Sequence, residues 1–353
     1  MSIEIHKTEK SRLSEVDFDN LGFGDEFSDH MFVMDYKDGK WQQPTIVPFQ
    51  NLTFSPAMIT LHYSQTIFEG LKAYHAKNGK INVFRPDRHA NRINISAKRL
   101  CIPEVDPKIF LEGLSTLLDL DREWVPKKEG DTMYIRPFIF ATDEYLGVAV
   151  SKTYKFMIIM SPVSKYYKEG LNPVSLMTSG QYTRACDGGT GFIKAGGNYA
   201  SSLYPAEEAK KKGYTQILWL DNKEHKYVEE VGTMNIFFLF EDELVTAPLE
   251  GTILAGITRD SIITLAKDWG YKVSERKLSI DEVLDRAEDG SLKEVFGAGT
   301  AAIISPVGKI NHRGREVTIG NNETGEFSKR IYDELNGIRY GDIEDKYGWN
   351  LSI

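Results

Sequence analysis

The sequence predicts an α/β protein built from two domains. Its 353 residues exceed the length of one ordinary domain. Stretches rich in β-branched and aromatic residues occur together with amphipathic stretches through the chain. Residues 166–175 interrupt this pattern with Lys, Gly and Pro among polar neighbours. We therefore expect an N-terminal domain over 1–165, a linker over 166–175 and a C-terminal domain over 176–353.

The first half contains strands and helices in turn. "KINVF" (80–84) predicts a strand, followed by a helix from about residue 87 that ends before Pro103. "DPKIFLEGLSTLLDL" (106–120) carries apolar residues at helical spacing. The aromatic and β-branched segments "TMYIRPFIFAT" (132–142) and "TYKFMIIMSPV" (153–163) predict two further strands.

The second half predicts a meandering sheet with helices between its strands. "YTQILWLD", "KYVEEV", "MNIFFLFED" and "ELVTAP" follow one another at short intervals. Residues 256–270 predict a helix that is bounded by a glycine at each end. Ser279 and Glu282 have the spacing of a capping box and predict the start of another helix.

Composition excludes several classes of protein. The hydrophobic fraction of 41% and charged fraction of 27% are typical of a soluble globular protein, and the longest apolar runs are too short to span a bilayer. The N-terminus lacks an apolar signal region, so we expect a cytoplasmic protein. A net charge of −8 without a long basic block disfavours nucleic-acid binding. Cys101 and Cys186 predict no disulfide framework but two partly buried thiols in a reducing compartment.

Common catalytic motifs are missing from the sequence. The seven histidines are scattered and there are only two cysteines, so no zinc spacing can be assembled, and we expect no metal. The sequence has no P-loop, no G-x-S-x-G elbow and no G-x-G-x-x-G between a strand and a helix. These absences disfavour a P-loop enzyme, an α/β-hydrolase and a dinucleotide-binding fold.

One lysine lies in a segment where glycines let the backbone turn or approach a ligand closely. "GGTGFIKAGGNYASSLYP" (188–205) places Lys194 between glycine pairs. A lysine amine becomes a nucleophile when burial or neighbouring positive charge lowers its pKa. Pyridoxal phosphate needs such a lysine, an acid facing its pyridine nitrogen and an anion site for its phosphate. By itself, however, Lys194 is more simply a solvated loop residue.

Other segments could supply the phosphate site and the acid. The amides of Ile257 and Thr258 begin a helix after Gly256, and "GAGTAA" (297–302) adds further amides and the Thr300 hydroxyl. Arg88, Arg92 and Arg99 are the candidate arginines of the first-half helix. Glu229 and Glu230 are adjacent in a predicted strand, so we expect one to face solvent and the other a cofactor.

The ordered motifs resemble one enzyme family over about residues 20–345. "LHYSQTIFEGLKAY", "MYIRPFIFATDEYLGV", "GFIKAGGNYASSL", "EEVGTMNIFF", "GITRDSI" and "FGAGTAAIISPV" are similar to the branched-chain amino acid aminotransferases. These are fold-type IV, pyridoxal-phosphate-dependent enzymes. The resemblance implies the D-amino acid aminotransferase-like fold, with the cofactor between a smaller N-terminal and a larger C-terminal domain. It also implies a homodimer, in which the loop holding Leu146 and Val148 reaches the neighbouring subunit.

The resemblance also implies roles for individual residues. Lys194 would hold pyridoxal 5'-phosphate covalently as an internal aldimine and later move the proton. The other implied cofactor contacts are Glu230 at the pyridine nitrogen, Tyr199 at the phenolic oxygen, Leu254 on the ring face, and Arg92, Ile257, Thr258 and Thr300 at the phosphate. The implied substrate pocket comprises Phe23, Tyr63, Phe68, Tyr134, Arg136, Tyr166, Thr300 and Ala301.

The implied reaction is reversible transfer of an amino group between L-leucine, L-isoleucine or L-valine and 2-oxoglutarate. Aromatic residues suit the aliphatic side chains, and Arg136 suits the distal carboxylate of glutamate. Its charge inside an apolar strand needs a partner or an anionic ligand. Ala302 and Ser305 stand where mitochondrial relatives carry a C-x-x-C pair, so we expect no thiol regulation there.

Other functions remain open from the sequence. D-amino acid transamination or aminodeoxychorismate lyase chemistry would use the same lysine and glutamate, although "YIRP" and the aromatic pocket disfavour both. A non-catalytic carrier of a phosphorylated cofactor is a candidate from another class, and Lys194, Glu230 and Tyr199 argue against it. No membrane or nucleic-acid partner is expected.

Overall fold

The computed structural model describes residues 2–164, 171–241 and 243–353. These residues divide into two compact units. Unit 1 contains the described residues of 1–168 together with 194–196 and 336–353. Unit 2 contains the described residues of 169–193 together with 197–335. The predicted linker lies partly outside the described residues, because its positions 166–170 are not among them.

Unit 1 is built on a 10-stranded sheet, as counted over the described residues. Its path runs β1-β4-β2-β9-β8-β6-β7-β19, with β3 beside β2 and β5 beside β8. The strands are β1 Glu4–Ile5, β2 His30–Lys37, β3 Lys40–Trp41, β4 Thr45–Pro48, β5 Thr66–Phe68, β6 Leu71–His75, β7 Ile81–Phe84, β8 Thr132–Ala141, β9 Tyr154–Val163 and β19 Asn350–Ser352. All pairings are antiparallel except β1 with β4. The two strands predicted for 132–142 and 153–163 are the long central pair β8 and β9.

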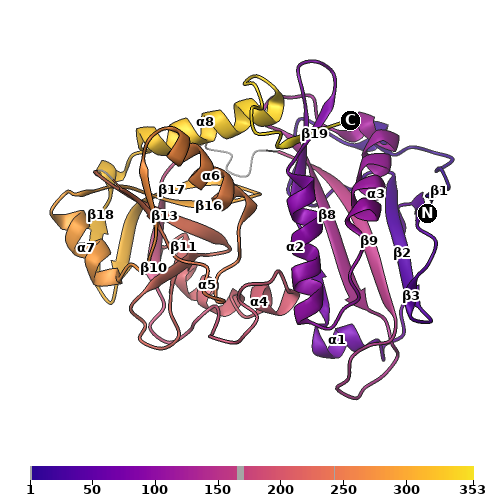
Figure 1. The fold of residues 1–353 in the computed structure, drawn as a ribbon, viewed down its shortest axis with the longest axis horizontal. Helices are drawn as coiled ribbons and strands as arrows, with labels where there is room; N and C mark the ends of the chain where they lie inside the picture. The colour runs from indigo at the N-terminus through magenta and orange to yellow at the C-terminus, as the bar shows by residue number, and fades with distance from the viewer. Residues whose placement is uncertain (1, 165–170, 242) are drawn as a thin grey trace. The chain divides into compact units, whose positions relative to one another are not determined.

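Two helices pack together beside the sheet of unit 1 (Figure 1). They are α2 Pro86–Arg99 and α3 Pro107–Leu120, at the positions that the sequence predicts. The side chain of Asp106 accepts a hydrogen bond from the Lys108 amide and begins α3. A Cβ atom at Gly113 would lie 2.6 Å from the Phe32 ring, so glycine lets α3 approach β2 closely. Short helices α1 Ile59–Tyr63, η1 Leu13–Glu15 and η2 Arg122–Trp124 complete the unit.

Unit 2 is built on a 9-stranded sheet among the described residues. Its path is β12-β11-β10-β17-β16-β13-β14-β15, and β18 pairs with β17. An additional pairing joins β12 to β13, so the six strands from β12 to β13 along this path form a closed ring. The strands are β10 Val174–Thr178, β11 Gln216–Leu220, β12 Val228–Val231, β13 Met234–Phe240, β14 Glu243–Thr246, β15 Lys272–Glu275, β16 Leu292–Gly299, β17 Ile303–His312 and β18 Arg315–Thr318. Every residue of β13 is buried, which explains its continuous apolar sequence.

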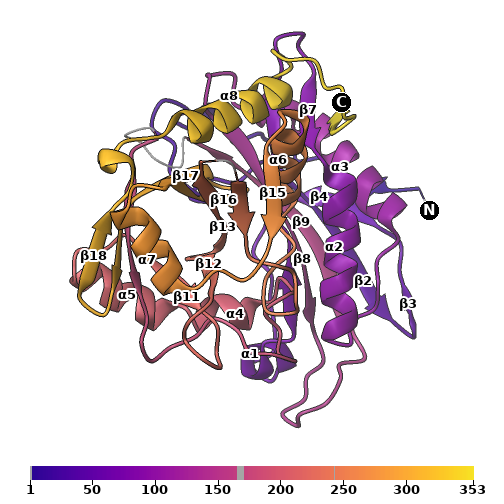
Figure 2. The same cartoon turned by 60° about the vertical axis from the view of Figure 1, so that its left-hand side comes forward.

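Helices cover the strands of unit 2. Helix α6 Ile257–Asp268 lies beside β15, as Figure 2 shows, and α7 Ile280–Glu288 contacts β16 and β18. Helix α5 Leu203–Lys211 packs on β11. The Ser279 side chain accepts a hydrogen bond from the Glu282 amide, which confirms that α7 begins at this predicted cap. The remaining elements are α4 Gly196–Ala200, η3 Gly320–Asn322 and α8 Glu326–Tyr340.

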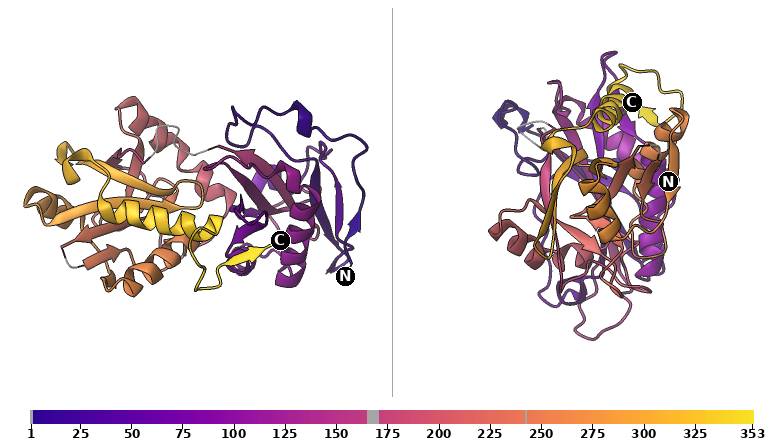
Figure 3. Two further views of the ribbon diagram at one scale, coloured as in Figure 1. Left: turned by 90° about the horizontal axis from the view of Figure 1, so that it is seen from above. Right: turned by 90° about the vertical axis from the view of Figure 1, so that its left-hand side faces the viewer.

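The C-terminal residues return to the sheet of unit 1. Asn350, Leu351 and Ser352 in β19 pair with β7 (Figure 3, yellow arrow beside the C label). The Asn82 side chain of β7 adds two bonds, donating to the Arg339 carbonyl and accepting from the Ser352 hydroxyl. Residues from both ends of the sequence therefore build unit 1.

Two predictions about exposure are wrong. Cys101 and Cys186 are both exposed and free, because each lies in a turn or loop rather than in the core that their apolar character favours. Glu229 and Glu230 are both buried, at 7% and 4% exposure, although we expected one to face solvent. The closed ring of strands explains this burial, since β12 is paired on both sides with β11 and β13.

Candidate active site

Lys194 is held in unit 1 by hydrogen bonds along its backbone. The Phe68 amide donates to the Lys194 carbonyl at 3.0 Å, and Ala195 forms a bridge with Ile67. The Lys194 amide donates to the hydroxyl of Ser96, in α2, at 3.1 Å. The backbone of Lys194 is thus fixed between β5 and α2, and this fixes the position of its Cα atom.

The amine of Lys194 lies in a partly buried, positively charged environment. Its Nζ is 4.6 Å from the centroid of the Phe68 ring. Burial and the neighbouring charge of Arg92 lower the pKa of Lys194 to about 8, against the smaller opposing effect of Glu69. An amine with this pKa is partly neutral near pH 8, and only the neutral amine is nucleophilic. The residue therefore has the chemistry needed to attack a carbonyl.

Arg92 is the one arginine of the three candidates in α2 that is buried. It is 8% exposed, whereas Arg88 and Arg99 are exposed. Its Nε and Nη2 donate to the two carboxylate oxygens of Glu69 at 2.7 Å and 2.8 Å. Glu69 also lies 2.6 Å from Nδ1 of His89. The two bonds from Arg92 fix the plane of its guanidinium.

Arg136, in β8, lies among predicted pocket residues of unit 1. Its Nη2 donates to the Tyr134 hydroxyl at 2.9 Å, and its guanidinium carbon is 4.6 Å from the Phe68 ring centroid. Phe23 contacts the Tyr134 ring with a centroid separation of 5.0 Å. The buried Nε of Arg136 has no hydrogen-bond partner in the part of the chain that the structure describes. A nitrogen of this kind can bind a carboxylate at little further cost of desolvation.

One predicted pocket residue of unit 1, Tyr63, is not joined to this cluster. The Tyr63 hydroxyl donates to the carbonyl of Leu146, and its side chain is 43% exposed. Tyr166 lies outside the described residues. Within unit 1 the structure therefore brings together Phe68, Tyr134, Arg136, Phe23 and Lys194, with Arg92 acting on the Lys194 amine.

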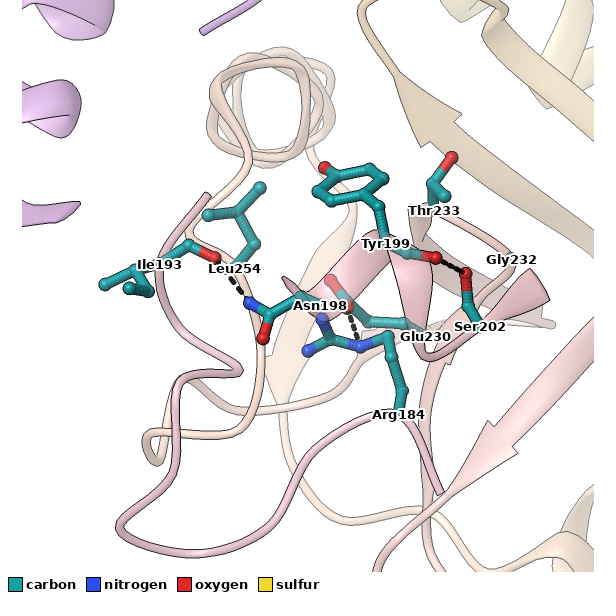
Figure 4. A pocket seen from close by; sticks show the side chains of 9 residues that line it. All are labelled: Arg184, Ile193, Asn198, Tyr199, Ser202, Glu230, Gly232, Thr233 and Leu254. Atoms are coloured by element: carbon teal, nitrogen blue, oxygen red, sulfur yellow. Dashed lines mark hydrogen bonds and ion pairs between the residues drawn. The ribbon is translucent and has the colours of Figure 1, made fainter. Parts of the chain in front are cut away.

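Glu230 forms a buried ion pair in unit 2. Its Oε2 lies 2.6 Å from Nε of Arg184, with side-chain exposures of 5% and 9% (Figure 4). The side-chain Nδ2 of Asn235 donates to Oε1 of Glu230 at 2.9 Å and to the Leu254 carbonyl at 2.9 Å. Arg184 and the side-chain amide of Asn235 therefore hold this carboxylate in a fixed direction.

A pocket in unit 2 is lined by three of the predicted cofactor contacts. Tyr199, Glu230 and Leu254 face it together with Arg184, Asn198 and Thr233 (Figure 4). The side-chain Nδ2 of Asn198 donates to the carbonyls of Thr190 and Ile193 at 2.7 Å and 3.0 Å. Asn198 thereby holds the loop that immediately precedes Lys194 in sequence.

The two predicted phosphate loops are also in unit 2. Gly256 is the N-cap of α6 and has no side chain to accept bonds from the first turn, where Ile257 and Thr258 lie. A Cβ atom at Gly256 would lie 1.9 Å from the Asn235 side-chain oxygen, so a larger residue would displace the side chain of Asn235. Thr300 and Ala301 form the turn between β16 and β17. The pocket in Figure 4 is not lined by Ile257, Thr258, Thr300 or Ala301.

The sequence reasoning missed residues that support the predicted ones. Glu69, His89, Arg184, Asn198 and Asn235 are the principal examples. Glu69 in "TIFEGLKAY" carries the same sequence signal as Arg136, a charge within an apolar strand. Arg184 in "YTRACDGG" carries no comparable signal, because it lies in a polar loop.

No group of His, Cys, Asp and Glu side chains suited to a metal ion is found among the described residues. Helices long and apolar enough to span a membrane are likewise absent from the described parts of the chain.

Comparison with known proteins identifies the class of enzyme. Residues 66–310 match the model of the family "Amino-transferase class IV". The chain therefore belongs to the class IV aminotransferases.

Its relatives share one more specific name. A Bacillus subtilis protein named branched-chain-amino-acid aminotransferase 2 is 50% identical, covering 99% of this chain and 96% of its own. A branched-chain-amino-acid aminotransferase of Mycolicibacterium smegmatis is 45% identical, over 94% of this chain and 91% of its own.

A solved structure agrees with this similarity. The Escherichia coli branched-chain amino acid aminotransferase has a TM-score of 0.73 at 29% identity, covering 92% of this chain and 98% of its own. These matches confirm the predicted family and its fold.

Proposed function

We propose that this chain is a branched-chain amino acid transaminase. It transfers the amino group reversibly between L-leucine, L-isoleucine or L-valine and 2-oxoglutarate. The names of relatives at 45–50% identity support this substrate class. The observation that carries the proposal is the Lys194 amine, whose pKa is lowered to about 8 beside Phe68 in the cluster that holds Arg136.

Pyridoxal 5'-phosphate is the cofactor that the predicted residues of each unit would bind. Lys194 would bind it covalently, and Glu230 would accept a hydrogen bond from its protonated pyridine nitrogen. Tyr199 would contact its phenolic oxygen and Leu254 its ring. Arg92, the amides of Ile257 and Thr258, and the Thr300 hydroxyl would bind its phosphate. The glycine N-cap of α6 supports this last assignment, since no cap side chain competes for the first-turn amides.

When bound, the cofactor supplies a carbonyl that accepts the amino group and a ring that withdraws electrons from the substrate Cα. The chain supplies the proton transfer. The neutral Lys194 amine accepts the proton from Cα and later returns it, as a general base with a pKa close to the working pH does. Glu230, held by Arg184 and Asn235, would keep the pyridine nitrogen of the bound cofactor protonated.

The substrate pocket has to accept an aliphatic side chain in one half-reaction and a carboxylate in the other. Phe23, Phe68 and Tyr134 offer ring surfaces to Leu, Ile and Val, with Tyr63 and Tyr166 as further proposed contacts. The Arg136 guanidinium would bind the distal carboxylate of glutamate, with its buried Nε as an additional donor. The amides of Thr300 and Ala301 would bind the α-carboxylate.

We also propose that the protein is a homodimer. Tyr145, Leu146, Val148 and Val150 belong to one loop of unit 1 and are each more than half exposed. Apolar side chains gathered in this way are typical of an interface between subunits. Sedimentation equilibrium of the unaltered protein and of the Leu146→Ser/Val148→Ser variant measures the association of the subunits. If the unaltered protein is a monomer, the homodimer proposal is refuted. A cytoplasmic location stays a prediction, consistent with two exposed free cysteines.

Lys194→Ala tests the function directly. We expect borohydride reduction with pyridoxal 5'-phosphate to add the cofactor to Lys194 in the unaltered protein, as mass spectrometry of peptides detects. The variant should lose this label and its L-leucine:2-oxoglutarate turnover by roughly a thousandfold or more. Lys277→Ala, at an exposed lysine, should keep both. Turnover of Lys194→Ala at the unaltered rate would refute the assignment, and so would activity confined to D-alanine or aminodeoxychorismate.

A further inference from the structure

Glu69 is a charged residue in the interior of unit 1. It follows β5 directly and is 0% exposed. Its amide donates to the Pro137 carbonyl at 2.7 Å, so its backbone is fixed against β8. A carboxylate in such a place is strongly destabilising unless cations and hydrogen-bond donors surround it.

The surroundings of Glu69 satisfy that condition. Arg92 donates to both carboxylate oxygens, and Nδ1 of His89 lies 2.6 Å from Oε2. Burial lowers the pKa of His89, so the neutral imidazole donates Nδ1–H to the carboxylate. The charge of Arg92 and the hydrogen bonds from Arg92 and His89 hold the pKa of Glu69 far below its usual range despite its burial. The carboxylate is therefore ionised, and the Glu69–Arg92 pair is the charged part of this triad.

The geometry of the pair orients the guanidinium. With Nε and Nη2 both bonded to Glu69, Nη1 is directed away from the carboxylate. The same pair acts on Lys194, since Arg92 and Glu69 shift its pKa in opposite directions. The ionisable groups that act on the Lys194 amine include Arg92, Glu69, Tyr134, Arg136 and His89.

Glu69 offsets the cations that act on the Lys194 amine. Arg92 and Arg136 both disfavour its ammonium, whereas the carboxylate of Glu69 favours it. We propose that Glu69 is a positioning residue, whose buried carboxylate orients Arg92 and supplies the counter-charge that allows Arg92 and the Lys194 ammonium to occupy one cluster. This inference rests on the proposed function, in which Lys194 and Arg92 bind the cofactor.

The test measures the reactivity of Lys194 in the apoprotein as a function of pH. Competitive acetylation with acetic anhydride, quantified by mass spectrometry of the Lys194 peptide, gives the midpoint at which the amine loses its proton. Glu69→Gln removes the counter-charge with little change of shape, so the midpoint should fall by about one pH unit. Glu69→Asp retains the charge and should shift the midpoint by less than half as much.

A double-mutant cycle separates the charge effect from a loss of packing. Arg92→Met removes the opposing cation and should raise the midpoint. Glu69→Gln/Arg92→Met removes both charges and should return the midpoint close to that of the unaltered protein. The double variant leaves no unpaired buried charge from this pair, so it remains measurable if Glu69→Gln does not fold. Asp121→Asn is the matched control, because Asp121 is a buried carboxylate 2.6 Å from Nδ1 of His30 in the same unit.

The outcomes discriminate clearly. A folded Glu69→Gln protein with an unchanged or raised midpoint overturns the proposal, as does a double variant that behaves like Glu69→Gln alone. An equal shift in Asp121→Asn would assign the effect to general loosening of unit 1 and would also overturn it. Failure of the proposed function looks different, since the unaltered protein would then lack the borohydride-fixed cofactor on Lys194, whatever Glu69→Gln does.

Discussion

Each unit contains a buried cluster of charges, and the two clusters are opposite in composition. In unit 1, Arg92 and Arg136 both act on the Lys194 amine, with Glu69 as a compensating carboxylate. In unit 2, Arg184 pairs with Glu230 and also acts on the neighbouring carboxylate of Glu229. The pKa of Lys194 is lowered in the first cluster, and burial raises the pKa of Glu229 in the second. The pKa shifts of Lys194 and Glu229 therefore both favour the neutral form of the side chain. Burial disfavours a charge of either sign when opposite charges and hydrogen bonds do not fully compensate for the lost water.

The largest expected effect comes from removing the cation of the acid-rich cluster. Arg184→Met leaves Glu230 as a buried charge without its counter-ion, which should lower the free energy of unfolding by about 3–5 kcal/mol. Urea unfolding of the apoprotein followed by circular dichroism measures this change. Arg184→Met/Glu230→Gln removes both charges and should recover most of the loss. A double variant as unstable as Arg184→Met would show that Arg184 acts through its bonds to the Gly191 and Thr252 carbonyls instead.

The cation-rich cluster can be probed through the pH dependence of Lys194. In the apoprotein its amine should lose a proton at about pH 8, whereas an exposed lysine keeps its proton until near its ordinary pKa of 10.5. The unfolded chain therefore binds more protons than the folded one between these pH values, and stability should rise with pH across that window. Lys194→Met should lack this component of the rise. An equal slope in both proteins contradicts the assigned pKa.

A smaller, substrate-dependent effect is expected at Arg136. Arg136→Met removes the proposed donor to the distal carboxylate of glutamate but leaves the aromatic surfaces in place. Single-turnover rates should fall by roughly tenfold to a hundredfold with L-glutamate, the value of a hydrogen bond to a charged group, and by less with L-leucine. Tyr134→Phe keeps the ring and removes only the hydroxyl that Arg136 contacts, so it should give a milder change of the same kind. Equal losses with both substrates would exclude the proposed role.

The smallest effect should come from Glu229, the acid of unit 2 without a full set of partners. Thr252 donates to its Oε1, while its Oε2 has no hydrogen-bond partner among the described residues. Because its pKa is raised on folding, Glu229 should stabilise the protein at acidic pH and lose that contribution as pH rises through the folded pKa. In Glu229→Gln, the free energy of unfolding should therefore decline less steeply with pH above the pKa that Glu229 has in the unfolded chain. An unchanged pH profile would show that Glu229 remains ionised.

The sequence predicts the fold well where its signals are local. The strand-length segments 132–142 and 153–163 and the helices at 106–120 and 257–268 need only periodicity and end signals to be identified. Exposure of the Glu229–Glu230 pair was predicted wrongly, because alternation along a strand does not reveal that the sheet closes into a ring. The roles of single residues came from resemblance to a family, and they remain predictions.

Supporting residues could not be predicted for a physical reason. Glu69 meets His89 and Arg92 across 20 and 23 residues of sequence, and Arg184 meets Glu230 across 46. Such pairings have no periodicity and depend on which surfaces the folded chain brings together. Glu69 could have been noted as a charge in an apolar strand, but its partners could not.

The pairing of β19 with β7 has a consequence for how this chain can be made and divided. During synthesis, β7 is complete long before residues 350–352 leave the ribosome, so one edge of its sheet stays open until those residues are available. An open edge is a template for intermolecular pairing. A fragment that ends at residue 164 would retain that open edge permanently and would also lack Lys194. Attempts to express the first unit alone should therefore yield aggregates, and a version carrying residues 336–353 on a short linker is the better dissection.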